Sequence, residues 1–178
     1  MSADDAPLQI AVMGVTGAGK TTVAQALAAE LHAEYIDADD LHPASNVSKM
    51  SAGVPLDDED RRPWLELVGY TVASRTGGVV VACSALKRRY RDALREHAPA
   101  LFFVHLAPSP TVLEARLAAR PDHFMPPGLL GSQLDTLETL EADEAGATIK
   151  ATGRVDELVS AIVALLLEEA REKAAFRS

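Results

Sequence analysis

The sequence holds a single cysteine, Cys83, among its 178 residues. One cysteine excludes an internal disulfide and fits a reducing compartment, which leads us to expect a cytoplasmic protein. Long hydrophobic runs are missing as well. The apolar run that begins at Leu8 is too short for a signal sequence, and the run from Ile162 to Leu167 is too short to span a bilayer. We therefore expect neither export nor a membrane partner.

A surplus of positive charge is also absent, because 17 lysines and arginines stand against 26 aspartates and glutamates and give a net charge of −9. Nucleic-acid backbones are bound by clustered lysine and arginine, so this balance argues against a nucleic-acid partner and favours a small ligand. No internal repeat or low-complexity stretch divides the chain. The length predicts one domain over residues 1–178, with residues 1–7 as a disordered leader.

What the sequence does contain is a phosphate-binding loop. An apolar segment over 8–13 indicates a buried strand and continues as G-x-x-x-x-G-K-T from Gly14 to Thr21, with apolar residues at helical spacing behind it. The glycines let successive N–H groups converge on a phosphate at a helix start, while the Lys20 ammonium reaches the β- and γ-phosphates and the Thr21 hydroxyl ligates Mg²⁺. A glycine-rich turn with a chance lysine is the less favoured alternative. The residues predicted to contact the nucleotide here are Gly14, Thr16, Gly17, Ala18, Gly19, Lys20, Thr21 and Thr22.

Short apolar runs alternate with helical patterns along the chain, as in a parallel sheet covered on both faces. The predicted strands span 8–13, 33–37, 78–83, 100–106 and 147–151. The predicted helices span 20–31, 43–51, 59–75, 86–97, 109–120, 127–139 and 155–170. The stretch 121–133 breaks the pattern with three prolines and two glycines, which predicts a movable loop at the place where a phosphoryl-transfer enzyme has its lid.

Acidic residues follow the second predicted strand. Alternation along that strand places Asp37 and Asp39 on one side, at the carboxyl edge where open α/β sheets bind ligands. One carboxylate would hold the Mg²⁺ shell, and the other would accept a proton from an attacking hydroxyl. The alternative is that these aspartates only cap the next turn or helix. The phosphate loop at the same edge favours the first interpretation.

A third cluster follows the third predicted strand, where Ser84 is expected to cap a helix whose first turn carries Lys87 and Arg88. A helix start with cations binds an anion or a transferring phosphoryl group. An ordinary cap with solvated cations is nearly as well supported by these residues alone. Further along, Arg116 and Arg120 lie four apart on one helical face before the expected lid, and they either embrace the nucleotide or are merely solvated.

Several longer segments are more specific than the phosphate loop. They are Asp37-Ala-Asp-Asp-Leu-His-Pro43, Asn46-Val-Ser-Lys-Met50, Gly53-Val-Pro-Leu56, Asp58-Glu-Asp-Arg-Arg-Pro-Trp64, Cys83-Ser-Ala-Leu-Lys87, Tyr90-Arg-Asp92, His123-Phe-Met125, Ser132-Gln133 and Thr136-Leu-Glu138. In this order, and together with Gly14 to Thr21, they cover nearly the whole chain. The sequence thereby resembles the small P-loop gluconate kinases, which phosphorylate D-gluconate at the 6-hydroxyl with ATP.

The resemblance implies a P-loop kinase fold, a three-layer α/β/α sandwich with a five-stranded parallel sheet in the order 2-3-1-4-5. It also implies a substrate-binding helical segment near 43–75, a helical lid near 120–135, the use of ATP and Mg²⁺, and a homodimer. By analogy with the related shikimate kinases, Asp37 would lie near the Mg²⁺ and Asp39 near the acceptor hydroxyl. The catalytic residues that follow are Lys20, Asp39, Lys87 and Arg120.

Gluconate is a polyhydroxylated anion, so its site needs a cation for the carboxylate and hydrogen-bonding groups for the hydroxyls. The chain departs from the family pattern at Pro121-Asp122 and at Thr139-Leu140, which leaves the lid contacts of Arg120 and His123 open. The residues predicted to bind the substrate are Asp39, His42, Lys49, Arg61, Ser84, Lys87, His123 and Gln133.

Two other functions stay open at this point. A kinase of the same fold that acts on shikimate or a nucleotide would keep the phosphate loop and Asp37, but it would not explain the Asp-Leu-His-Pro or Asp-Arg-Arg-Pro-Trp segments. A regulatory module that binds ATP without turnover is the second alternative. Against it stand Lys20 and Thr21 together with acidic and cationic groups on the acceptor side.

Overall fold

The computed structural model describes residues 7–119 and 128–176. Its centre is a five-stranded parallel sheet in the order β2-β3-β1-β4-β5, as predicted. The strands are β1 (Gln9–Met13), β2 (Glu34–Asp37), β3 (Val79–Ala82), β4 (Phe102–Leu106) and β5 (Gly146–Ile149). The expectation of a doubly covered α/β sheet is confirmed, and the five strands lie within two residues of the predicted ranges.

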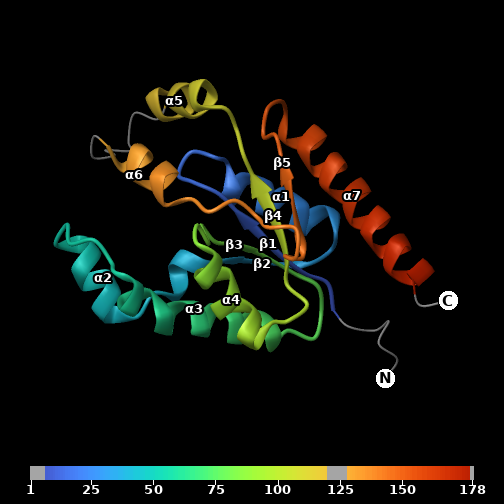
Figure 1. Cartoon of the computed structure of the whole chain (residues 1–178), viewed down its shortest axis with the longest axis horizontal. Coiled ribbons are helices and arrows are strands. Elements are labelled where there is room, and N and C mark those ends of the chain that lie inside the picture. Colours follow the sequence, from blue (N-terminus) through green and yellow to red (C-terminus); the bar gives the residue numbers. More distant parts are fainter. Residues whose placement is uncertain (1–6, 120–127, 177–178) are drawn as a thin grey trace.

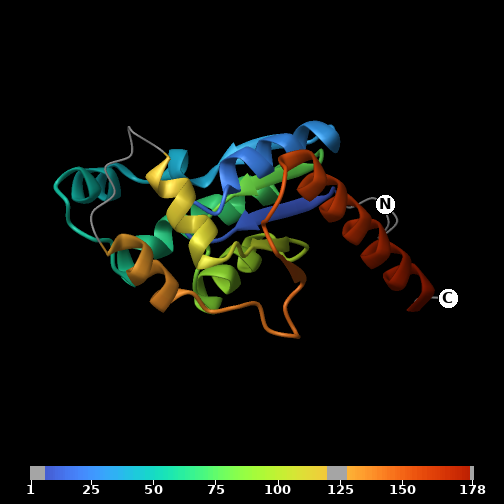
Figure 2. The ribbon, with the colours of Figure 1, turned by 90° about the horizontal axis from the view of Figure 1, so that it is seen from above.

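Helices cover both faces of this sheet (Figures 1 and 2). The α-helices are α1 (Lys20–Glu30), α2 (Ala44–Ser51), α3 (Asp58–Ala73), α4 (Arg88–His97), α5 (Pro110–Ala118), α6 (Leu129–Thr136) and α7 (Val155–Phe176), and a 3₁₀ helix, η2, spans Ala38–Leu41. None of the helices in the described ranges is long and apolar enough to cross a membrane. The predicted leader, residues 1–7, falls almost wholly outside the described residues, as does the 120–127 part of the expected lid.

Alternating strand residues divide the core in two. Ile10 and Val12 of β1 pack with α1 and α7 on one face, whereas Ala11 and Met13 pack with α3 and α4 on the other. All four side chains are fully buried, which explains why the strand is apolar at every position instead of every second one. Both cores therefore hold β1 in place, and with it the loop that follows.

Two predictions beside the site are wrong. Strand β2 ends at Asp37, as predicted, but Asp39 lies beyond it in the 3₁₀ helix η2, so strand alternation does not place Asp39 beside Asp37. Helix α4 begins at Arg88, with Lys87 at its N-cap position in extended backbone, so Ser84 does not cap it. Ser84 lies instead in the loop between β3 and α4. The expected helix start with an anion-binding first turn is therefore not formed there.

Side-chain contacts at the N-terminus of α3 hold helices α2 and α3 together. Asp57 and Asp60 form a reciprocal capping box, with each side chain accepting a hydrogen bond from the backbone N–H of the other. Lys49 of α2 donates to both Asp60 carboxylate oxygens at 2.6 and 2.8 Å. This ion pair raises the pKa of Lys49 and lowers that of Asp60. The segment predicted to bind substrate thus consists of two helices, α2 and α3, that this ion pair holds together.

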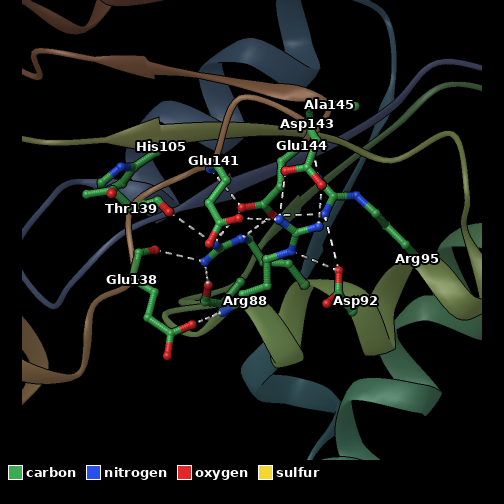
Figure 3. Close-up of polar contacts among 12 residues, drawn as sticks. Arg88, Asp92, Arg95, His105, Glu138, Thr139, Glu141, Asp143, Glu144 and Ala145 are labelled. Atoms are coloured by element: carbon green, nitrogen blue, oxygen red, sulfur yellow. Dashed lines mark hydrogen bonds and ion pairs between the residues drawn. The ribbon is translucent and has the colours of Figure 1, made fainter.

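A buried ion pair fastens α4 to the segment between α6 and β5 (Figure 3). The Arg91 guanidinium donates to both carboxylate oxygens of Glu144 at 2.7 Å, and both side chains are fully buried. Arg95 adds a third bond to Glu144 at 2.9 Å. Burial on its own would raise the pKa of Glu144, but these hydrogen bonds, with one from the Glu141 backbone N–H, lower it to about 2.

This pair predicts a defined loss of stability in acid. The carboxylate of Glu144 stabilises the fold above its unfolded pKa of 4.5, and this contribution is lost as the pH falls through about 2. The full loss amounts to roughly 3 kcal/mol. Urea unfolding between pH 6 and pH 2 should give a shallower dependence on pH for Glu144→Gln than for the parent chain, while Glu141→Gln on the surface keeps the parent slope. A Glu144→Gln variant with an unchanged slope would contradict this account.

Candidate functional site

A cavity of about 680 Å³ opens at the carboxyl edge of the sheet, where the loops after β1, β2 and β3 meet α2, α3 and α6. Ligands of open α/β sheets bind at this edge. Apolar residues of the loop after α2 and the first residues of α6 complete its walls. The polar and aromatic residues that line it are Thr16, Lys20, Thr21, Asp37, Asp39, His42, Arg61, Trp64, Ser84, Ser132 and Gln133.

The phosphate loop has the backbone that its glycines predict. Gly14 has a φ of 148°, and a Cβ there would lie 2.8 Å from the carbonyl oxygen of Leu106, so the loop passes β4 too closely for any side chain. Gly19 has a φ of 94° and directly precedes α1. The N–H groups of the first turn of α1 are therefore presented at the loop, as a phosphate site requires. The Lys20 ammonium donates to the Val15 carbonyl across the same loop at 3.1 Å.

Oxygen groups suited to Mg²⁺ converge beside the loop. Thr21 at the start of α1 and Asp37 at the end of β2 both line the cavity, and the Tyr35 hydroxyl donates to Asp37 Oδ2 at 3.3 Å. Burial and then the charge of Asp37 raise the pKa of Tyr35, which keeps this hydroxyl protonated. No cluster of three or more histidine, cysteine or acidic side chains fit to hold a metal occurs among the described residues. One hydroxyl and one carboxylate suit Mg²⁺, which keeps several waters and binds phosphates.

The two acidic residues have different surroundings. Asp37 Oδ1 accepts the backbone N–H of Asp39 at 3.0 Å, so Asp37 caps η2 and also lines the cavity; the capping interpretation is confirmed for Asp37, and its role toward Mg²⁺ stays a prediction. The Asp39 side chain is 83% exposed and reaches the cavity without a cap role. Partial loss of solvation of its carboxylate beside the cavity, and then the negative charge of Asp37, raise the pKa of Asp39.

The placement of Asp39 depends on Trp64, which the sequence did not mark as a site residue. The buried indole N–H of Trp64 on α3 donates to the Ala38 carbonyl of η2 at 2.7 Å. Its ring stacks on His42 at a centroid distance of 4.1 Å. A long-range bond and a ring contact therefore fix both ends of η2, and with them the direction in which Asp39 points.

The proton on His42 is placed by Asn46, a second residue missed from the sequence. Asn46 is buried, and its amide nitrogen lies 2.9 Å from the Asp60 carbonyl and 3.3 Å from His42 Nδ1. Because an amide nitrogen only donates, Nδ1 accepts and Nε2 carries the proton of the neutral ring. Nε2 lies 3.8 Å from Asp39. Burial lowers the pKa of His42 despite this carboxylate, so the ring is neutral at neutral pH.

The predicted cations are distributed unevenly. Arg61 lines the cavity, with its guanidinium carbon 5.7 Å from the centre of the Tyr90 ring. Lys87 is outside the lining and forms an ion pair with Asp58 at 3.1 Å, as Lys49 does with Asp60. Arg88 pairs with Asp143 and Glu141 on the far side of α4. The structure thus brings Arg61 to the cavity and leaves Lys49, Lys87 and Arg88 bonded to neighbouring carboxylates.

On the other side of the phosphate loop, Arg116 lines a second cavity of about 320 Å³ with Gly17, Gly19, Thr22 and Gly153. Its guanidinium donates to the carbonyls of Ala18 at 3.0 Å and Ala151 at 2.9 Å. The 151–153 loop was not marked by the sequence, since it carries only small and polar residues.

Gln133 of α6 bonds to the phosphate loop itself. Its side-chain oxygen accepts the backbone N–H of Thr16 at 2.6 Å, so α6 is attached directly to the loop. The other two lid residues named from the sequence, Arg120 and His123, lie outside the described residues. Helix α6 itself falls within the predicted helix over 127–139.

Comparison with known proteins finds relatives with a similar sequence and fold. A family model described as an AAA domain matches residues 10–140. The thermoresistant gluconokinase of Escherichia coli (strain K12) is 41% identical over 160 residues, which cover 88% of this chain and 90% of that protein. The crystal structure of a gluconokinase from Sinorhizobium meliloti 1021 matches 97% of this chain and 98% of its own, at 46% identity and a TM-score of 0.86. A shikimate kinase from Acinetobacter baumannii shares the fold alone, with 20% identity, a TM-score of 0.58, and coverage of 94% of this chain and 97% of that one.

Proposed function

Because the chain belongs to the gluconokinase family, we propose that this gluconate kinase transfers the γ-phosphoryl group of ATP to the 6-hydroxyl of D-gluconate, giving 6-phospho-D-gluconate and ADP. The observation that carries the proposal is the single cavity in which Asp39, His42 and Arg61 face the phosphate loop. A regulatory module without turnover would have no use for acceptor-side groups in that position.

On the nucleotide side, the phosphate loop and the first turn of α1 would hold the phosphates, and Lys20 would stabilise the charge that moves during transfer. Thr21 and Asp37 would hold Mg²⁺, which when bound neutralises charge on the β- and γ-phosphates. The second cavity, beside Arg116, has the position and small-residue lining that suit the nucleobase. Arg120 of the expected lid is proposed to add a further positive charge.

On the acceptor side, Arg61 would bind the gluconate carboxylate, since a guanidinium makes paired hydrogen bonds to a carboxylate. Asp39 would accept the proton of the 6-hydroxyl, and the raised pKa of its carboxyl makes it a stronger base than an ordinary aspartate. Ser84 and the Nε2–H of His42 would bind hydroxyl groups. Lys49 and Lys87 would act through their partners, by fixing the N-terminus of α3 from which Arg61 projects.

A coupled assay for ADP release tests the proposal against its alternatives. The panel contains D-gluconate, an epimeric aldonate, shikimate and a nucleoside monophosphate, each with Mg·ATP, and ³¹P NMR identifies the product. We expect gluconate-dependent ADP release and a phosphomonoester at the 6-position. Turnover of another acceptor without turnover of gluconate would overturn the proposal, and ATP binding without turnover of any acceptor would support the regulatory module.

The oligomeric state and the location in the cell stay predictions. The family resemblance predicts a homodimer, and the single cysteine predicts the cytoplasm. Light scattering on the purified chain measures the first, and cell fractionation measures the second.

A further inference from the structure

Arg91 takes no part in the proposed chemistry, yet its guanidinium is one of the most fully bonded groups in the described chain. Besides the two bonds to Glu144, it donates to the carbonyls of Ala85 at 3.1 Å and Leu86 at 3.4 Å, and to those of Glu138 at 3.0 Å and Thr139 at 3.3 Å. Balancing the charge of Glu144 would need only the first two bonds. The four carbonyls belong to two segments far apart in the sequence.

The first of these segments lines the acceptor side of the cavity. Cys83 and Ser84 are lining residues, and the next residue, Ala85, has a φ of 45°. A residue with a side chain adopts this left-handed backbone at an energetic cost and keeps it only where its surroundings impose it. The Arg91 bond to the Ala85 carbonyl is one such constraint. It holds the turn that directs Ser84 into the cavity.

The second segment leads to the phosphate loop through α6. The backbone N–H of Glu138 donates to the Leu86 carbonyl at 2.8 Å, and the Glu138 carboxylate accepts the backbone N–H of Arg88 at 2.6 Å. Five residues earlier, Gln133 bonds to Thr16. A short path of bonded segments therefore runs from the acceptor loop, through Arg91 and α6, to the loop that holds the phosphates.

We propose that Arg91 is a positioning residue for phosphoryl transfer. It fixes the acceptor loop over 83–87 and helix α6 relative to each other. The acceptor hydroxyl thereby stays in line with the phosphoryl group that the phosphate loop holds. The planar guanidinium is needed because its five N–H donors, one of them shared between the Ala85 and Leu86 carbonyls, serve a carboxylate and four carbonyls at once. The effect expected on turnover rests on the proposed kinase function. The joining of the two segments by Arg91 does not depend on that function.

The chain offers a matched pair of variants, Arg91→Lys and Arg95→Lys. Arg95 also bonds to Glu144, but its other contacts are to the Ala145 carbonyl, to the Asp92 carboxylate and to the Phe103 ring, and none of these lies in either segment. We expect Arg91→Lys to lower kcat about tenfold or more, since small displacements of reacting groups carry large penalties, with the KM for ATP little changed. Arg95→Lys should lower Tm but keep kcat. Unchanged kcat in Arg91→Lys, or equal losses in both variants, would overturn the proposal.

Hydrogen exchange without substrates tests the joining of the segments apart from activity. Amides in 83–88 and in 128–139 should exchange faster in Arg91→Lys at a temperature well below its Tm, whereas Arg95→Lys should leave both segments unchanged. Unaltered exchange in Arg91→Lys would overturn the proposal even if kcat fell. If the parent chain phosphorylates no gluconate, the proposed function fails, and the exchange experiment still decides the role of Arg91.

A surface pair keeps the test decisive if Arg91→Lys does not fold. Glu138 and Glu141 are both exposed and both bond to Arg88, but only Glu138 bonds to its backbone N–H at the junction of the two segments. Glu138→Ala should lower kcat severalfold and speed exchange in 83–88, whereas Glu141→Ala should do neither. Identical kinetics and exchange in the two variants would overturn the proposal.

Discussion

Replacing Lys20 by alanine should lower turnover about 10³-fold or more, which is the scale of removing a fixed charge from a developing phosphoryl transition state. The ammonium contacts the Val15 carbonyl at the edge of the cavity and is not part of either core, so the fold should persist. The measurement is kcat at saturating ATP and gluconate, together with Tm.

Lys173→Ala is the control for the loss of one lysine charge, because Lys173 lies near the end of α7, away from both cavities. It should keep the parent kcat. Near-normal turnover of Lys20→Ala with an unchanged Tm would mean that the phosphate loop is not the site of transfer.

Asp39→Asn should lower turnover about 10²-fold or more while ATP binding stays nearly intact, because an amide keeps the shape of the carboxyl but accepts no proton. In a loose transition state the proton leaves the hydroxyl late, so the loss of turnover would be smaller. Most of that loss would then come from poorer positioning of the hydroxyl. Asp40→Asn is the matched control, since Asp40 is the exposed neighbour in η2 and does not line the cavity. Equal kinetics for Asp39→Asn and the parent chain would remove Asp39 from the mechanism.

The pH dependence supplies an independent check on Asp39. Its pKa is raised, so the carboxyl gains its proton at a higher pH than an ordinary aspartate does as the solution is acidified. If Asp39 is the base, the acidic limb of the kcat/KM profile should lie above the ordinary value of about 4. Asp37→Asn should instead raise the Mg²⁺ concentration needed for half-maximal rate. The assignment of the two residues would be reversed if Asp37→Asn lost gluconate binding alone.

The sequence predicted the parts of the fold that local pattern determines. The apolar runs of β1, β3 and β4 and the phosphate loop have signals within a dozen residues, and the resemblance to gluconate kinases supplied the strand order. The position of Asp39 could not be predicted in the same way. Its 3₁₀ helix depends on a hydrogen bond from Trp64, which is 26 residues away along the chain.

The error at Ser84 has a related cause. A serine before a run of lysine and arginine has the local pattern of a helix cap, but the helix starts four residues later because Ala85 takes a left-handed backbone. Bonds from Arg91 hold that backbone. The ion pairs of Lys49 and Lys87 with α3 likewise depend on tertiary neighbours that spacing alone does not indicate.

Trp64 is the only tryptophan in the chain, and it stands in the wall of the cavity with its ring stacked on His42. The protein thus carries a natural optical reporter at its acceptor site. All of its indole emission comes from one place, and a ligand that settles against His42 alters the polarity and quenching around that ring. Titrations followed by intrinsic fluorescence would read acceptor binding directly, without a label and in variants that no longer turn over.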